Sequence, residues 1–128
     1  MQDTSEQATF RASVRAFVQR EISPHINAWD EAGSFPRALY ARAAAVGLLQ
    51  LGYPEHLGGT PCEWPWRLIA TQEIASAGSG GLMASLFSHN IGLPPIVAHG
   101  SAELQRRVRS GQALADGTLC RAGRLRGQ

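Results

Sequence analysis

Residues 80–100, GGLMASLFSHNIGLPPIVAHG, indicate how the rest of this 128-residue chain is organised. Their apolar side chains would point to nearly every side of a helix, which is typical of a helix inside a core or a membrane. A membrane span needs roughly 20 uninterrupted apolar residues, and Ser85, His89 and the Pro94-Pro95 pair interrupt this stretch. We therefore expect a helix of a water-soluble protein, with neighbours on most sides and a bend or restart at the prolines.

The composition is that of one globular domain, with 44% hydrophobic and 17% charged residues. The net charge of +2 is too small to indicate nucleic-acid binding by itself, although six arginines lie in the last quarter of the chain. Cys62 and Cys120 are far apart and belong to no CxxC motif, which predicts reduced thiols and a cytoplasmic location. The polar N-terminus has no apolar signal segment.

The flanking segments show helical periodicity. A first helix is expected from Thr4, with Gln7 completing a capping box, and it should continue with a kink past Ser23-Pro24 to about residue 33. A second should begin with Pro36 as its first residue and end at Gly47. Further helices are expected over about 63–77 and 101–111. No strand pattern of useful length appears, so we predict an all-α fold of about five to six helices.

The sequence contains few motifs that are typical of catalytic, metal-binding or phosphate-binding sites. The four histidines are scattered, and none pairs at helical spacing with another metal-binding side chain. The Gly78-Ser79-Gly80-Gly81 run follows no strand, which favours a break between helices over a phosphate cradle. The carboxylates, among them Glu73, are expected on solvent faces without an acid/base pair, although a lone buried carboxylate stays possible. We predict no catalytic residue and no metal ligand.

The ordered motifs resemble those of acyl-CoA dehydrogenases. They are a first helix ending in WDEAG, a helix start at Phe35-Pro36, GLL followed by PEHLGG, the QEIA segment, and HGSAE before the last helix. No single piece is specific, but the ordered set is, and it covers about nine-tenths of the chain. The resemblance implies the N-terminal helical domain of that family, an orthogonal helical bundle that we assign to residues 1–117.

The resemblance also implies a function. Family members use FAD to remove hydrogens from Cα and Cβ of acyl-CoA thioesters, with a carboxylate as the base. By resemblance, Met83, Ala84 and Phe87 occupy positions that line the acyl-chain cavity; ordinary core packing is an equally good account of them. The cofactor-binding residues are unknown from this sequence.

The chain departs from the family pattern after Gly117. Residues 118–128, TLCRAGRLRGQ, replace the expected first strand and the flavin-binding T-E-P segment, and they look like an irregular Arg/Gly-rich tail. A truncated or frameshifted product and a genuine basic tail both fit this ending. Because the flavin-binding β domain and the catalytic carboxylate domain are lacking, we expect no complete catalysis by this chain alone.

Two further hypotheses about function remain open beside the dehydrogenase domain. The second is a helical binding or assembly module that docks onto a flavin-carrying partner subunit. A homo-oligomer is also possible. The third and weakest hypothesis is nucleic-acid binding through the arginine tail. No membrane partner is expected.

Overall fold

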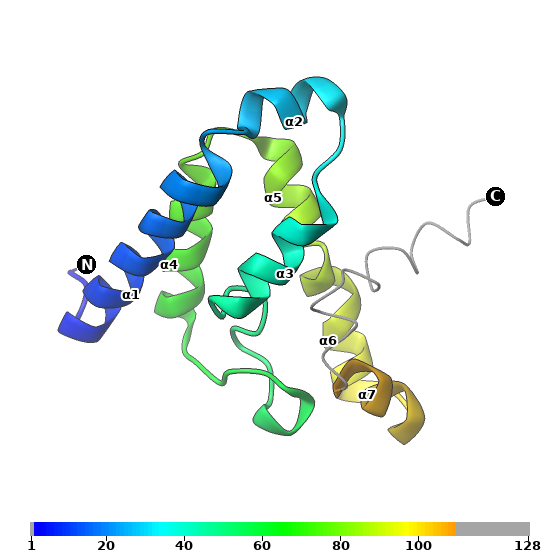
Figure 1. The fold of residues 1–128 in the computed structure, drawn as a ribbon. Coiled ribbons are helices and arrows are strands. Elements are labelled where there is room, and N and C mark those ends of the chain that lie inside the picture. The colour runs from blue at the N-terminus through cyan, green and yellow to red at the C-terminus, as the bar shows by residue number, and fades with distance from the viewer. Residues whose placement is uncertain (1, 110–128) are drawn as a thin grey trace.

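The first helix, α1 (Ser5–Phe17), begins where its capping box places it. The structure, a computed structural model, describes residues 2–109 (Figure 1). The Thr4 side chain accepts a hydrogen bond from the Gln7 backbone N–H at 3.2 Å, and the Gln7 side chain accepts one from the Thr4 N–H at 2.9 Å. These bonds pair two of the N–H groups that have no partner inside a helix, so the predicted capping box is confirmed.

A π-helical turn, η1 (Val18–Ile22), follows α1, and a turn over residues 23–25 then interrupts the helix where the kink was predicted. The Ser23 N–H bonds to the Val18 carbonyl, five residues earlier, at 2.8 Å. The chain then continues as α2 (Ile26–Ala32), which ends at Gly33 in the left-handed conformation, φ 68°. The expected long first helix is therefore α1 with its π turn, a short turn over residues 23–25, and then α2.

Helix α3 (Arg37–Ala45) starts one residue later than predicted. Pro36 has extended backbone angles, φ −60° and ψ 138°, so it is the N-cap and not the first helical residue. Gly47, with φ 83°, reverses the chain after the helix as predicted. A loop with one short 3-10 turn, η2 (Glu55–Leu57), leads to the next helix.

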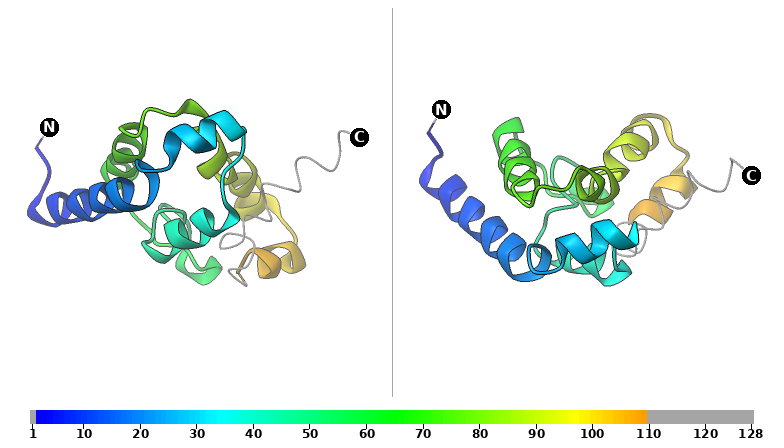
Figure 2. Two further views of the ribbon diagram at one scale, coloured as in Figure 1. Left: turned by 45° about the horizontal axis from the view of Figure 1, so that its top comes forward. Right: turned by 90° about the horizontal axis from the view of Figure 1, so that it is seen from above.

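Helix α4 (Trp64–Ala75) lies alongside α1, as Figures 1 and 2 show. After it the chain turns through Gly78, with φ 82°, and enters α5 (Gly80–Leu86), where Ser79 is the N-cap. The glycine-rich run is thus a break between helices, as the sequence favoured. In Figure 1, α5 leads from beneath α2 toward the centre of the molecule, to the right of α4.

The expected central helix breaks earlier than the prolines. The chain leaves helical geometry at Phe87, with φ −103° and ψ 10°, and restarts as α6 (His89–His99). Pro94 and Pro95 lie inside α6. Neither proline can donate a hydrogen bond to the carbonyl four residues before it, yet the helix continues through both. The prediction of a restart at the prolines was therefore wrong.

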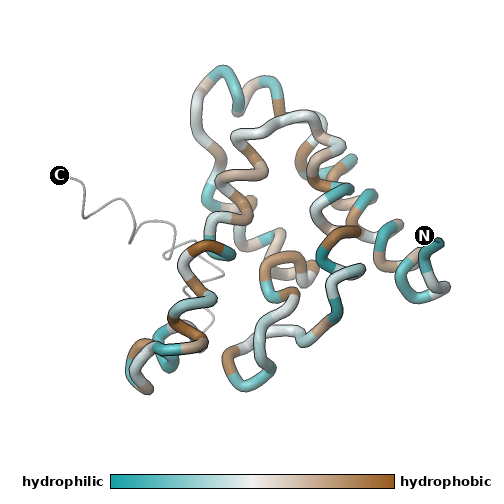
Figure 3. The backbone as a smooth tube through the Cα atoms, turned by 180° about the vertical axis from the view of Figure 1, so that it is seen from behind, coloured by the Kyte–Doolittle hydropathy of each residue, from teal (hydrophilic) through white to brown (hydrophobic). Residues whose placement is uncertain are grey.

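The described residues supply only part of the neighbours expected around α6. Leu93 is 1% exposed, but Ile91 on another face is 80% exposed. Hydrophobic positions, drawn brown in Figure 3, run through α6 as well as through the central helices. The α6 helix therefore buries one side only against the described residues.

The last described helix is α7 (Ala102–Arg109). The Ser101 side chain accepts a hydrogen bond from the Leu104 N–H at 3.2 Å, which confirms the predicted N-cap. Residues 110–128 lie outside the described residues, and so do Cys120 and the predicted tail over 118–128.

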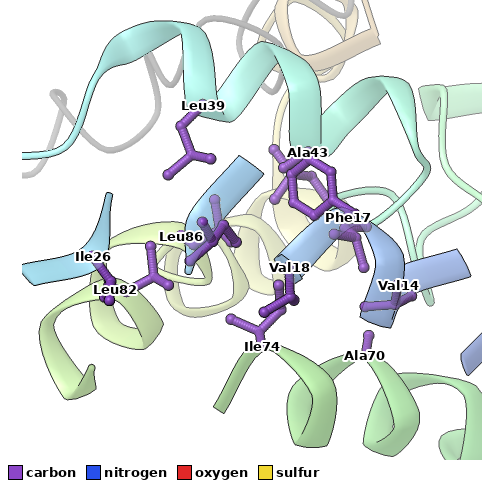
Figure 4. Close-up of a cluster of buried hydrophobic side chains, with 13 residues drawn as sticks. Val14, Phe17, Val18, Ile26, Leu39, Ala43, Ala70, Ile74, Leu82 and Leu86 are labelled. Atoms are coloured by element: carbon purple, nitrogen blue, oxygen red, sulfur yellow. The ribbon is translucent and has the colours of Figure 1, made fainter. Parts of the chain in front are cut away.

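The core is one cluster of apolar side chains contributed by α1, η1 and α2–α5, together with the segment after α3. Figure 4 shows Val14 and Val18 close to Ala70 and Ile74 of α4, while Leu82 and Leu86 of α5 lie farther along the cluster. Full burial of a valine, leucine, isoleucine or phenylalanine side chain contributes roughly 1.5–3 kcal/mol to the stability of the fold. A smaller cluster joins Tyr53 to α6.

The described residues contain seven α-helices and no strand beyond an isolated bridge between Leu51 and Thr60. The all-α fold class is confirmed. The five helices expected individually become seven because the first and the central ones are each divided. Within residues 2–109, no helix is long and apolar enough to cross a membrane.

Candidate functional site

The three residues assigned to an acyl cavity lie on α5 and its C-terminal end. Met83 and Phe87 are one helical turn apart, and the Phe87 N–H bonds to the Met83 carbonyl at 3.1 Å. Both side chains are half-buried and pack against the core, whereas Ala84 is exposed. The structure thus keeps the three together, with one side of Met83 and Phe87 against the core and another free.

Two polar contacts fasten α5 to the helices around it. The Tyr40 hydroxyl of α3 and the Ser85 hydroxyl are 2.7 Å apart, within hydrogen-bonding distance. At the start of α5, the Ser79 hydroxyl donates to Asp30 of α2 at 2.7 Å and accepts from the Leu82 N–H at 3.1 Å. A helix held at its N-terminus and near its C-terminus presents its side chains in fixed directions, which a binding surface requires.

The Ser79 contacts also exclude a phosphate cradle at the glycine-rich run. Its hydroxyl is engaged with both Asp30 and the backbone, and the Asp30 carboxylate would repel a pyrophosphate. The glycine-rich run therefore does not fit the flavin phosphates.

The junction of α5 and α6 contains a buried histidine that sequence reasoning left unassigned. His89 is 6% exposed, and its Nε2 lies 2.9 Å from the Leu49 carbonyl oxygen. Burial lowers the pKa of His89, although bonds to the Leu49 and Leu86 carbonyls oppose that shift. The ring is therefore neutral at physiological pH, with the Nε2–H donating to Leu49.

A buried carboxylate that the sequence analysis placed on a solvent face lies between α1 and α4. Glu73 is 5% exposed and bonds to Arg15 through two nitrogens and to Arg11 through one, each at 3.0 Å. Arg11 also pairs with Asp3. The prediction was wrong because Glu73 belongs to the same face of α4 as Ile69 and the other buried residues.

This cluster is structural rather than catalytic. Hydrogen bonds from Arg15, opposed by burial and reinforced by Arg11, hold the pKa of Glu73 below its usual value of 4.5. A general acid would need a raised pKa, and a general base near neutral pH would need one close to 7. Glu73 therefore stays ionised and ties α1 to α4. The i, i+4 spacing of Arg11 and Arg15 in α1 was the available sequence signal.

Other groups in the described region offer no reactive centre. No three histidine, cysteine or carboxylate side chains among residues 2–109 are placed to hold a metal ion. Cys62 is a free, half-buried thiol, and burial raises its pKa, which lowers its reactivity.

Comparison with known proteins shows to which family this helical domain belongs. The family model for the acyl-CoA dehydrogenase N-terminal domain matches residues 4–115. The chain belongs to the acyl-CoA dehydrogenase family. A crystal structure of a probable acyl-CoA dehydrogenase from Mycobacterium abscessus superimposes with a TM-score of 0.80 at 42% identity, over 88% of this chain and 30% of that one.

Two other acyl-CoA dehydrogenases are similar to this chain in sequence. The probable acyl-CoA dehydrogenase YngJ of Bacillus subtilis is 30% identical over 116 residues, which cover 87% of this chain and 30% of that protein. The mitochondrial long-chain specific acyl-CoA dehydrogenase of Sus scrofa is 37% identical over 100 residues, which cover 78% of this chain and 23% of that enzyme. The chain thus spans under a third of these relatives and corresponds to the N-terminal domain of an acyl-CoA dehydrogenase-like protein.

Proposed function

We propose that this chain forms the helical wall of an acyl-thioester site in a flavin-dependent dehydrogenase acting on CH–CH groups. The observation that carries the proposal is the family match over residues 4–115 together with the placement of Met83, Ala84 and Phe87 on one stretch of α5. The acyl-CoA dehydrogenase family is FAD-dependent in general.

The three side chains suit an apolar tail. Met83 is flexible and adapts to irregular apolar shapes, Phe87 offers a broad apolar surface, and Ala84 adds a small exposed apolar side chain beside them. Each methylene group transferred from water onto such a surface contributes about 0.8 kcal/mol when fully buried. Binding to this wall should therefore strengthen with acyl-chain length.

The flavin phosphates would be held elsewhere than at the glycine-rich run, where Ser79 is already bonded to Asp30. The contribution of the flavin when bound is to accept a hydride from the substrate. The role proposed for this helical unit is to bind and orient the acyl chain and to exclude water from it. The assignment of residues 1–117 to the helical domain and 118–128 to a tail remains a prediction.

The two methionines of the chain give a direct test, since [methyl-13C]methionine labelling yields signals only from Met1 and Met83. Titration with octanoyl-CoA should move the Met83 signal, whereas CoA without an acyl group should not. Butanoyl-CoA should bind more weakly than octanoyl-CoA. A Met83 signal that responds equally to CoA and octanoyl-CoA would contradict an acyl site at α5.

The exposed side of α6 favours a second candidate, a module that docks onto a flavin-carrying protein. Ile91 is 80% exposed, and Leu104 of α7 is 37% exposed. The test is to mix this chain with the separately expressed remainder of the Mycobacterium abscessus relative and measure flavin-dependent oxidation of octanoyl-CoA. Recovery of activity that Ile91→Ser weakens would support docking, and unchanged activity in that variant would argue against docking through α6.

A further inference from the structure

His89 is the most enclosed polar group at the end of the proposed acyl-binding helix. Its Nε2 lies 2.9 Å from the Leu49 carbonyl and its Nδ1 lies 3.2 Å from the Leu86 carbonyl. Its ring also lies against two aromatic rings, with centroids 6.0 Å away in Tyr53 and 6.4 Å away in Phe87. The His89 side chain therefore contacts three parts of the molecule. These are the end of α5, Phe87 of the proposed site, and the loop after α3.

Only one of these two nitrogen contacts is a hydrogen bond of the neutral ring. With the proton on Nε2, the ring donates to the Leu49 carbonyl, while Nδ1 carries no proton and lies beside the Leu86 carbonyl. The bond from Nε2–H to the Leu49 carbonyl connects the start of α6 to a segment 40 residues earlier. The angle between α5 and α6 is thus fixed by a tertiary hydrogen bond.

The loop that receives this bond is itself held in place. The Gln50 side chain donates to the Ala44 carbonyl at 2.9 Å, and the Gln50 carbonyl accepts from the Thr60 N–H at 2.9 Å. A second link from the loop reaches α6, because the Tyr53 hydroxyl donates to the Asn90 side chain at 2.7 Å. Two polar links between a fixed loop and neighbouring residues of α6 leave the junction little freedom to turn.

We propose that His89 is a positioning residue for acyl binding, which sets the direction of Phe87 and Met83 by tying the α5–α6 junction to the Leu49 carbonyl. The proposal rests on the proposed function. Because Phe87 is two residues from His89 and caps α5 through the Met83 carbonyl, a rotation at the junction would move both side chains.

The test compares substitutions that keep and remove the hydrogen-bond donor. His89→Gln retains an N–H near the position of Nε2, whereas His89→Leu leaves the Leu49 carbonyl without its donor. His99→Leu is the matched control, because His99 is an exposed histidine on the same helix. Val14→Ala, in the core between α1 and α4, controls for loss of stability without a change at the junction.

The first measurement is the Met83 methyl signal of each protein without ligand. His89→Leu should displace or split this signal under conditions where the protein is still folded by circular dichroism, and His89→Gln should restore most of the wild-type position. Val14→Ala and His99→Leu should leave it in place. A wild-type Met83 signal in folded His89→Leu would overturn the proposal, as would an equal displacement in Val14→Ala.

The second measurement is the affinity for octanoyl-CoA. His89→Leu should weaken binding about tenfold, as expected when a buried hydrogen bond that maintains a site is lost, and His89→Gln should recover most of the affinity. If wild-type protein shows no acyl-dependent response, the proposed function fails, and the spectra without ligand still decide whether His89 positions Met83. Equal affinities of His89→Leu and wild type would overturn the role in acyl binding.

Discussion

Helices α4 and α6 are similar in length, at 12 and 11 residues, and both carry many apolar side chains, yet the described structure treats them differently. Helix α4 buries Ile69, Ala70 and Ile74, and places the buried Glu73 carboxylate among them. Helix α6 buries His89 and Leu93 while Ile91 stays 80% exposed. Apolar content alone thus does not determine burial; what matters is whether a neighbouring helix lies against that face.

The largest expected effect tests this difference with the same substitution in both helices. Ile74→Ala should destabilise the protein by about 2–5 kcal/mol, because Ile74 is 0% exposed and its loss leaves a cavity. Ile91→Ala should change stability by at most about 0.5 kcal/mol, as is usual for surface positions. Urea unfolding monitored by tryptophan fluorescence measures both.

Equal losses of stability in the two alanine variants would mean that Ile91 is covered in solution. In that case, the unfolding midpoint of the wild type should rise with protein concentration, as it does for an associating protein. Analytical ultracentrifugation of Ile91→Ala would then show whether that residue lies in the contact.

A smaller effect is expected from the ion pairs between α1 and α4. Glu73→Gln should cost roughly 1–3 kcal/mol, because the buried side chain loses its charge-assisted bonds to Arg15 and Arg11. Glu31→Gln, at an exposed carboxyl on α2, is the control and should have little effect. Urea midpoints of the three proteins at pH 7 measure the difference.

The same variant should alter the response to acid. The pKa of Glu73 is lowered in the folded state, so below its usual value of 4.5 the unfolded chain binds more protons than the folded one. The stabilisation from Glu73 is therefore complete above that pH and is lost as the pH falls through the folded-state pKa. Wild type should lose more stability than Glu73→Gln between pH 5 and pH 3, and parallel losses would show that the ion pairs do not govern acid unfolding.

The smallest effect concerns backbone flexibility in α6. Gly92 is a glycine inside this helix, and an added Cβ would meet nothing within 4 Å. Gly92→Ala should raise stability by about 0.5–1 kcal/mol, because glycine loses more backbone entropy than alanine in a helix.

Gly59 gives the opposite case. A Cβ there would overlap the Tyr53 backbone carbonyl, so Gly59→Ala should destabilise the protein. Thermal unfolding of both alanine variants makes the comparison, and a destabilised Gly92→Ala would indicate that α6 is packed at Gly92 in solution.

Local features of the fold were predictable because they depend on neighbouring residues. The capping box at Thr4 and Gln7, the left-handed glycine at Gly47 and the N-cap at Ser101 were each visible in the sequence and are each present. The helical periodicity of the apolar residues also predicted the all-α fold class. These features form within one helical turn, where sequence spacing and spatial distance are nearly equivalent.

Features that depend on distant contacts were missed. The break at Phe87 lies where His89 bonds to Leu49, and no local signal marks it, whereas the prolines gave a misleading one. The spacing of Glu73 to Ile69 places it on the buried face of α4, but its pairing was missed because the two arginines lie 58 and 62 residues away. The acyl-site assignment of Met83, Ala84 and Phe87 came from family resemblance and stays a prediction.

The π-helical turn at Val18–Ile22 has a consequence for insertions and deletions. A π turn accommodates one more residue than an α-helical turn. Deleting one residue there would therefore leave an α-helical turn and keep the direction of the following residues nearly unchanged. Deleting one residue within α1 would instead rotate the two sides of the deletion by about 100° relative to each other. Buried side chains such as Val14 and Ile26 would then no longer face the same core. A single deletion should thus cost less at the π turn than within α1.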